Sequence, residues 1–300
     1  MSKKYKRDKE FQKNAMGEFV CIEGDNYHIY QTGHGEDALV FLAGEGVPSP
    51  VLDFKPLWLL LKDNFKIIIL EKAGYGFSDI TDKSRDIATL VEDNRLMLKN
   101  LKIKPPFILL SHSLSGLEAI YWAQHFENEI KALIALDMSI PSILKITKIP
   151  VLTRLAMCVF SIFKNTNINK ERAIKLTNKL PSFSLLNYED KAAYLNIIKH
   201  RFMTVNMINE IKLLNENINT IEKISYPKDI PLLFFSSNLI DAAKNANTTS
   251  EKLLLLQKAF IDGFFSAKHI QFNCNHFIHA YESKKIAHEI KAFISKIFSF

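Results

Sequence analysis

The chain has 300 residues, of which 47% are hydrophobic and 24% charged, and its formal net charge is +7 at pH 7. These proportions are typical of a folded globular protein, and they exclude a disordered tail, a collagen-like repeat and a low-complexity protein. The longest apolar run, Leu155 to Phe163, lies between Arg154 and Lys164. It is too short to be a membrane-spanning helix, which needs about 20 apolar residues.

The basic residues do not indicate a nucleic-acid partner. Apart from the N-terminal run KKYKRDK, lysine and arginine are scattered along the chain, and we find no nucleic-acid-binding motif. We interpret the excess of basic residues as side chains on a solvated surface. A weak contact of the basic N-terminus, or of basic residues near Arg154, with an anionic membrane surface stays open.

The cysteines point to a reducing compartment. Cys21, Cys158 and Cys274 lie far apart and form no CxxC pair. No apolar segment of the secretory kind follows the basic N-terminus. We therefore expect a cytoplasmic protein without a disulfide framework.

Along the chain, residues 1–15 are polar and predict a loosely attached tail. Strands and helices then alternate, and the later strands read as continuous apolar runs, which is typical of a parallel sheet in an α/β fold. The first six expected strands are Phe19 to Cys21, Tyr27 to Gln31, Ala38 to Leu42, Lys66 to Leu70, Phe107 to Leu110 and Ala132 to Leu136. Helices are expected over 50–62 and 84–102, and from Gly116 to about Phe126.

Residues 140–228 interrupt this alternation with helical patterns and no convincing strand. Helices are expected there over 150–163, 170–179, 188–200 and 203–215. The α/β pattern resumes with strands over 231–235 and 269–272 and helices over 250–264 and 281–298. We therefore expect an α/β core over 16–139 and 229–300, with a helical cap over 140–228 inserted after the sixth strand. The apolar residues of the cap fit simple packing onto the core, an apolar substrate pocket or a lipid-facing lid.

Ser113 is the candidate nucleophile. It stands between the apolar strand that ends at Leu110 and a helix, in the segment SHSLSG. A serine at such a sharp junction is exposed above the carboxyl edge of the sheet, at a helix N-terminus. The turn requires small residues on both sides of the serine. Ser111 and Ser115 stand where glycines are usual, and both are small.

His276 is the candidate base because it follows the last expected strand by a few residues and so also lies at the carboxyl edge. His279 competes for this role, and the pair could instead bind a metal. Asp137, after the sixth strand, and Asp241, after the seventh, are the alternatives for the acid that orients His276. Glu118, on the helix after Ser113, is expected at the surface.

The loop Ala43-Gly44-Glu45-Gly46 follows the third strand and predicts one half of an oxyanion hole. The backbone N–H groups of Glu45 and Leu114 are the expected donors to developing negative charge. The loop GYG at 74–76 does not complete a dinucleotide-binding GxGxxG, because Asp79 occupies the third glycine position.

Taken together, these segments resemble the α/β-hydrolase superfamily of serine hydrolases, of the esterase or lipase kind with a helical cap. The resemblance is carried by LVFLAGEG, LEKAGYGFSD, LLSHSLSG, IALDMSIP and NCNHFIHAYESKKIAHEIKAFI, in this order. It covers residues 17–140 and 228–298. It implies a mostly parallel eight-stranded sheet with helices on both faces. Ala43, where the family usually has histidine, is a departure, as are Ser111 and Ser115.

The resemblance implies a serine hydrolase that cleaves a carboxylic ester or thioester of a small molecule through an acyl-enzyme. Ser113 would be the nucleophile, His276 the base, and Asp137 or Asp241 the acid. No metal or organic cofactor is implied. The alternative is a catalytically inactive protein of the same fold that binds a small ligand or a partner.

Overall fold

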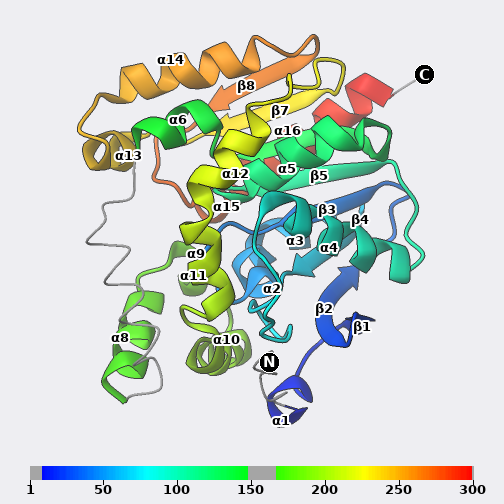
Figure 1. The fold of residues 1–300 in the computed structure, drawn as a ribbon, viewed down its shortest axis with the longest axis vertical. Helices are drawn as coiled ribbons and strands as arrows, with labels where there is room; N and C mark the ends of the chain where they lie inside the picture. Colours follow the sequence, from blue (N-terminus) through cyan, green and yellow to red (C-terminus); the bar gives the residue numbers. More distant parts are fainter. Residues whose placement is uncertain (1–8, 148–166, 299–300) are drawn as a thin grey trace.

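A computed structural model describes residues 9–147 and 167–298 (Figure 1). Its centre is one eight-stranded sheet with the order β1-β2-β4-β3-β5-β6-β7-β8. The strands are β1 (Glu18–Ile22), β2 (Asp25–Thr32), β3 (Ala38–Leu42), β4 (Lys66–Glu71), β5 (Phe107–His112), β6 (Ile130–Leu136), β7 (Leu232–Ser236) and β8 (Ala267–Gln271). Strand β2 is antiparallel to β1 and β4, and the remaining pairs are parallel. This arrangement confirms the predicted α/β fold with a mostly parallel sheet.

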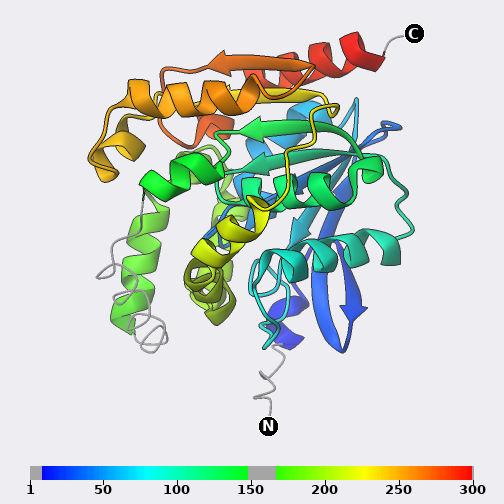
Figure 2. The same cartoon turned by 45° about the horizontal axis from the view of Figure 1, so that its top comes forward.

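Helices cover both faces of this sheet (Figure 2). Helices α3 and α16 pack together on one face, and α4 and α5 pack together on the other. The helices of the core are α2 (Pro50–Asp53), α3 (Lys55–Leu61), α4 (Ile87–Asn100), α5 (Ser115–His125), α13 (Ile240–Asn245), α14 (Ser250–Ile261), α15 (Ile278–Tyr281) and α16 (Ser283–Phe298). Because both faces are covered, the central strands are mostly apolar.

The pleat of β3 divides the core into two layers. Leu39 and Phe41 point to the side of α3 and α16, whereas Val40 and Leu42 point to the side of α4 and α5. All four side chains are buried almost completely. At about 25 cal/mol per Å² of apolar surface removed from water, such double-sided burial is the main force that holds the sheet together.

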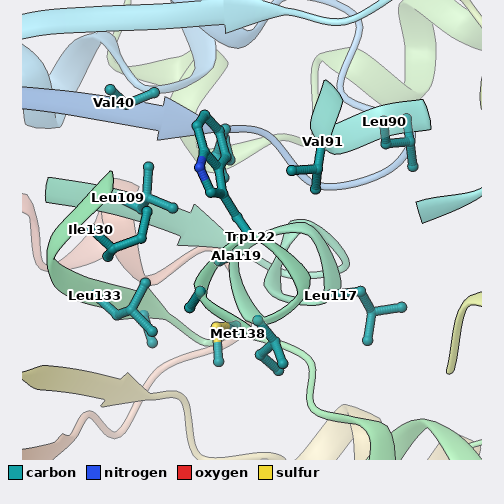
Figure 3. Close-up of a cluster of buried hydrophobic side chains, with 14 of the residues drawn as sticks. Val40, Leu90, Val91, Leu109, Leu117, Ala119, Trp122, Ile130, Leu133 and Met138 are labelled. Carbon is teal, nitrogen blue, oxygen red and sulfur yellow. The ribbon is translucent and has the colours of Figure 1, made fainter. Parts of the chain in front are cut away.

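Trp122 anchors α5 to the sheet (Figure 3). Its side chain is fully buried, and its Nε1 donates a hydrogen bond to Glu129 Oε2 at 2.8 Å. The apolar residues labelled around it are Val40, Leu90, Val91, Leu109, Leu117, Ala119, Ile130, Leu133 and Met138. This packing fixes α5 against the sheet.

The chain segment between β6 and β7 contributes only helices among its described residues, and we call these helices the insertion. They are α6 (Pro141–Ile146), α8 (Asn167–Thr177), α9 (Pro181–Ser184), α10 (Tyr188–Arg201), α11 (Val205–Lys212) and α12 (Leu214–Ile221). They gather at the carboxyl end of the parallel strands (Figure 2). The helix expected over 150–163 lies outside the described residues. The domain boundaries stay a prediction.

Two expected helices are each divided in two. The helix over 50–62 is broken at Phe54 into α2 and α3, and Pro56 sits in the first turn of α3, where a proline is tolerated. The helix over 203–215 ends at Lys212 and is followed by α12. None of the helices in the described ranges has the length and apolar character that crossing a bilayer requires.

The prediction that residues 1–15 form a loosely attached tail was wrong for the described residues from Lys9 onward. Helix α1 (Lys9–Gln12) places Phe11, only 4% exposed, against the ring of Phe77 at a centroid distance of 4.8 Å. Gln12 Nε2 donates hydrogen bonds to Phe77 O and Asp79 Oδ1, both at 2.9 Å. The buried Phe11 ring and the Gln12 hydrogen bonds together attach this otherwise polar segment to the core.

Candidate active site

Ser113 sits in a strained turn between β5 and α5. Its φ is +58°, in the left-handed region that non-glycine residues rarely adopt. The turn is held because Ser113 O accepts hydrogen bonds from Gly116 N at 3.0 Å and from Ser139 N at 2.9 Å. The side chain is half-buried. This is the geometry of a nucleophile elbow, which presents a hydroxyl above the carboxyl edge of the sheet.

The serines that replace the usual glycines fit the turn. Ser115 is fully buried, and its Oγ donates to Leu42 O at 2.7 Å and accepts from His112 N at 3.0 Å. The close approach that needs a glycine occurs one residue later. A Cβ on Gly116 would lie 2.1 Å from Met138 Cγ. The usual pattern, with a glycine two residues before and two residues after the serine, does not predict that the required glycine lies one residue later.

His276 forms a hydrogen bond with Asp137. Its Nδ1 lies 2.6 Å from Asp137 Oδ2. Since a carboxylate accepts, we assign the proton to Nδ1, which leaves the lone pair on Nε2 for accepting a proton from a substrate or nucleophile. Burial lowers the pKa of His276, but the hydrogen bond to Asp137 and the charges of Asp137 and Asp53 outweigh burial, and the pKa is raised. The His276 side chain remains 41% exposed, so the ring can receive a substrate.

Of the two carboxylates that the sequence left open, Asp137 is the one at His276. It directly follows β6 with a φ of +43°, is 5% exposed, and accepts a second hydrogen bond from Ser237 N at 2.9 Å. Asp241 is exposed on α13. The structure thus brings Ser113, His276 and Asp137 to one edge of the sheet, whereas the described hydrogen bonds include none between Ser113 Oγ and His276. Their catalytic roles stay a prediction.

The two expected oxyanion donors flank Ser113. A Cβ on Gly44 would lie 2.8 Å from Ser113 Cβ, so only glycine lets this loop approach the nucleophile so closely. Among the described hydrogen bonds, none uses the backbone N–H of Glu45 or of Leu114. Both N–H groups are therefore available to an acceptor at Ser113.

Two further histidines, His112 and His279, form a group of rings with His276. His279 is fully buried, and its Nε2 lies 3.0 Å from Asp53 Oδ2. His279 is therefore paired with Asp53 and not with Ser113. The ring of His112 packs between His276 and His279 at centroid distances of 4.7 and 4.6 Å. Over residues 9–147 and 167–298, no group of three or more His, Cys, Asp or Glu side chains is arranged to hold a metal ion. Sequence reasoning missed His112 and Asp53, although His112 directly precedes the nucleophile.

Two recesses meet at Ser113 and His276. The smaller has a volume of about 140 Å³ and is also lined by Glu45, Asp53 and Tyr194. The larger has a volume of about 320 Å³ and runs past Leu114 and Asp137 toward helix α13. Its other lining residues are Ser139, Leu144, Leu214, Ser237, Asn238, Leu239, Asp241, Ala242, Asn245 and Asn275. A molecule bound at Ser113 would thus have two recesses open to it.

A buried ion network connects the core to the insertion. Lys72, which follows β4, donates to Glu118 Oε1 at 2.7 Å and to Glu210 Oε2 on α11 at 3.0 Å. Arg85 donates to Glu210 Oε1 through Nε at 3.1 Å and Nη2 at 2.7 Å, and Tyr75 OH donates to Glu210 Oε2 at 2.9 Å. The expectation that Glu118 is a surface residue was wrong, because it is 3% exposed and paired with Lys72.

The chain is similar to a bacterial protein of nearly the same length. It is 31% identical over 289 residues to the uncharacterized protein YbdG of Bacillus subtilis, covering 94% of this chain and 87% of that protein. It is also 28% identical over 122 residues to the cis-3-alkyl-4-alkyloxetan-2-one decarboxylase of Shewanella oneidensis, covering 40% of this chain and 37% of that enzyme. No family model matches the chain.

Solved structures share the whole architecture. The epoxide hydrolase VrEH1 from Vigna radiata superimposes with a TM-score of 0.70 at 18% identity, covering 95% of this chain and 99% of that one. An epoxide hydrolase from Bacillus megaterium superimposes with a TM-score of 0.66 at 15% identity, covering 93% of this chain and 100% of that one. At such identities the likeness concerns the fold.

Proposed function

Because the chain belongs to the α/β-hydrolase superfamily, we propose that it is a serine hydrolase that cleaves a carboxylic ester or thioester. The observation that carries this proposal is the His276–Asp137 hydrogen bond of 2.6 Å at the same sheet edge as Ser113, whose φ is +58°. A serine, a histidine and a buried carboxylate in this arrangement are the parts that acyl transfer requires. We assign the insertion the role of a cap over this site.

In the first half of the proposed reaction, Ser113 Oγ attacks the carbonyl carbon of the substrate. His276 Nε2 takes the hydroxyl proton, and Asp137 stabilises the imidazolium that results. The N–H groups of Glu45 and Leu114 donate hydrogen bonds to the carbonyl oxygen as it becomes negative. His276 then returns the proton to the leaving alcohol or thiol, and the acyl group remains as an ester of Ser113.

In the second half, water replaces the leaving group. His276 Nε2 takes a proton from the water as its oxygen attacks the acyl carbon, and the second tetrahedral intermediate uses the same two N–H groups. Collapse of the intermediate breaks the bond to Ser113 Oγ, which recovers the proton from His276. The product is a carboxylic acid, and the reaction consumes one water and no cofactor.

The nucleophile argues against epoxide or haloalkane substrates, because the branches of the superfamily that act on them use aspartate at this position, where this chain has Ser113. The name of the Shewanella relative, by contrast, describes an enzyme that acts on an oxetan-2-one, which is a cyclic ester. An ester carbonyl suits a serine nucleophile with an oxyanion hole.

Labelling with a fluorophosphonate tests this function directly, because the probe reacts only with an activated serine. We expect the folded protein to be labelled, Ser113→Ala not to be labelled, and 4-nitrophenyl esters to be hydrolysed only by the unmodified chain. A folded protein that neither reacts with the probe nor hydrolyses esters would contradict the proposal. It would instead support the reading as a ligand-binding protein without catalysis.

A further inference from the structure

The smaller of the two recesses at Ser113, which we call the small pocket, has a largely apolar wall that carries several polar side chains. It carries the carboxyl groups of Glu45 and Asp53, and its described lining residues include no lysine or arginine. Its volume of about 140 Å³ is close to the roughly 150 Å³ of a cavity that holds one benzene molecule. The small pocket therefore accepts a short substituent and places it beside acidic groups.

One oxygen of the Glu45 carboxyl group lacks a partner. This oxygen, Oε1, is buried and makes no hydrogen bond with the described residues. Burial and then the charge of Glu210 raise the pKa of Glu45 to about 7, although Lys72 acts in the opposite direction. A buried carboxyl oxygen without a partner costs free energy, which a bound group with a hydrogen to donate would recover.

Two more lining residues have unpartnered polar atoms. Tyr194, which reaches the small pocket from helix α10 of the insertion, is fully buried, and its hydroxyl makes no hydrogen bond with the described residues. His112 Nε2 lies 3.2 Å from His276 O and must carry a hydrogen, because a carbonyl only accepts. Burial, with the neighbouring His279 and His276, lowers the pKa of His112 well below its usual value. His112 is therefore neutral, and its unpartnered Nδ1 is an acceptor.

The polar atoms in the wall of the small pocket are thus mainly acceptors. Asp53 already accepts from Ser182 Oγ and pairs with His279, so it is fixed in place. His112 and the ionised form of Glu45 contribute the unpartnered acceptor atoms, and the Tyr194 hydroxyl can accept as well as donate. An apolar substituent would leave all of these atoms without partners.

We propose that the small pocket is a specificity subsite for a short substituent of the scissile carbonyl that ends in a hydrogen-bond donor, a hydroxyl or an ammonium group. This inference rests on the proposed function, since it concerns the substrate held at Ser113. Glu45, His112 and Tyr194 line the small pocket, and on binding the Glu45 and Tyr194 side chains turn their buried unpartnered atoms toward the donor. A site built on such hydrogen bonds rejects an analogue that lacks the donor.

Three esters of nearly equal size test the acyl side: ethyl 3-hydroxypropionate, ethyl 3-aminopropionate and ethyl butyrate. The alcohol side is tested with 2-hydroxyethyl acetate against propyl acetate. Acid release is followed by titration at constant pH for the unmodified chain and for Glu45→Gln, Tyr194→Phe and Tyr281→Phe. Tyr281 is an exposed tyrosine on α15, so this variant loses the same atom outside the small pocket. Circular dichroism shows that each variant is folded.

We expect a donor-bearing ester of at least one side to be preferred over its apolar counterpart by about 10-fold or more in kcat/KM. Glu45→Gln and Tyr194→Phe should each reduce that preference about 5- to 10-fold, and Tyr281→Phe should not change it. A larger effect of Glu45→Gln on the amino ester than on the hydroxy ester would identify the ammonium group as the natural occupant.

The subsite and the proposed function fail in different ways. If all the esters are hydrolysed but the apolar ones are preferred on both sides, the subsite is wrong and the hydrolase stands. The same conclusion follows if both pocket variants keep the preference of the unmodified chain. If no ester is hydrolysed and Ser113 is not labelled by the fluorophosphonate, the proposed function itself is wrong.

Discussion

Replacing Glu210 by glutamine removes the charge at the centre of the buried network between the core and the insertion. Glu210 accepts two hydrogen bonds from Arg85, one from Lys72 and one from Tyr75. Arg85 is 1% exposed, and its next acidic neighbour, Asp93, is 3.8 Å away. Glutamine keeps the shape of the side chain but leaves a buried guanidinium short of a counter-charge.

The expected cost is large because breaking a buried ion pair on one side destabilises a protein by about 3 to 5 kcal/mol. The entropy of unfolding is about 0.6 kcal/mol per kelvin for a chain of 300 residues. Glu210→Gln should therefore lower Tm at pH 7 by about 5 to 8 °C, measured by scanning calorimetry. Glu216→Gln, an exposed change on the neighbouring helix α12, is the matched control and should leave Tm unchanged.

The effect should also depend on pH. Burial raises the pKa of Glu210, but the charges of Lys72 and Arg85 outweigh burial and hold the pKa below its ordinary value. Such a carboxylate stabilises the fold above its unfolded pKa of about 4.3, and this stabilisation is lost as the pH falls through the folded value. The Tm difference should shrink below pH ~4. A difference under about 2 °C at pH 7 would refute the idea that this charge holds the insertion to the core.

Further changes test the site itself. Asp137→Asn should lower kcat about 10,000-fold in ester hydrolysis whereas Asp241→Asn should not, and equal losses would mean that Asp137 is not the acid. Since the pKa of His276 is raised, kcat/KM should fall on the acid side with a midpoint above the usual value of about 6.5, and a midpoint below it would contradict the assigned hydrogen bond. Ser115→Gly restores the usual residue but removes the hydrogen bond to Leu42 O. It should lower the free energy of unfolding, measured with urea, by about 1 to 3 kcal/mol. An unchanged or raised free energy of unfolding would show that this hydrogen bond is dispensable.

Local patterns in the sequence were sufficient for the sheet and for the neighbourhood of the nucleophile. The apolar runs at β3, β4, β5 and β7 are visible because strands buried on both faces are apolar along most of their length. Ser113 was found because an elbow requires an apolar strand, small residues and a helix in immediate succession. His276 followed from chain order, since the loop after the last parallel strand ends at the same edge of the sheet.

Contacts between residues far apart in the chain were decided only in the tertiary structure. Asp137 and Asp241 both follow parallel strands, and no local pattern tells which of the two carboxylates meets His276. Glu118 was expected at the surface, yet it is buried and paired with Lys72. Tyr194 enters the small pocket from the insertion in the same way. Apolar periodicity indicates which face of a helix or strand is buried. The partner of a buried polar group, by contrast, depends on how elements far apart in the chain pack together. No local sequence pattern predicts that packing.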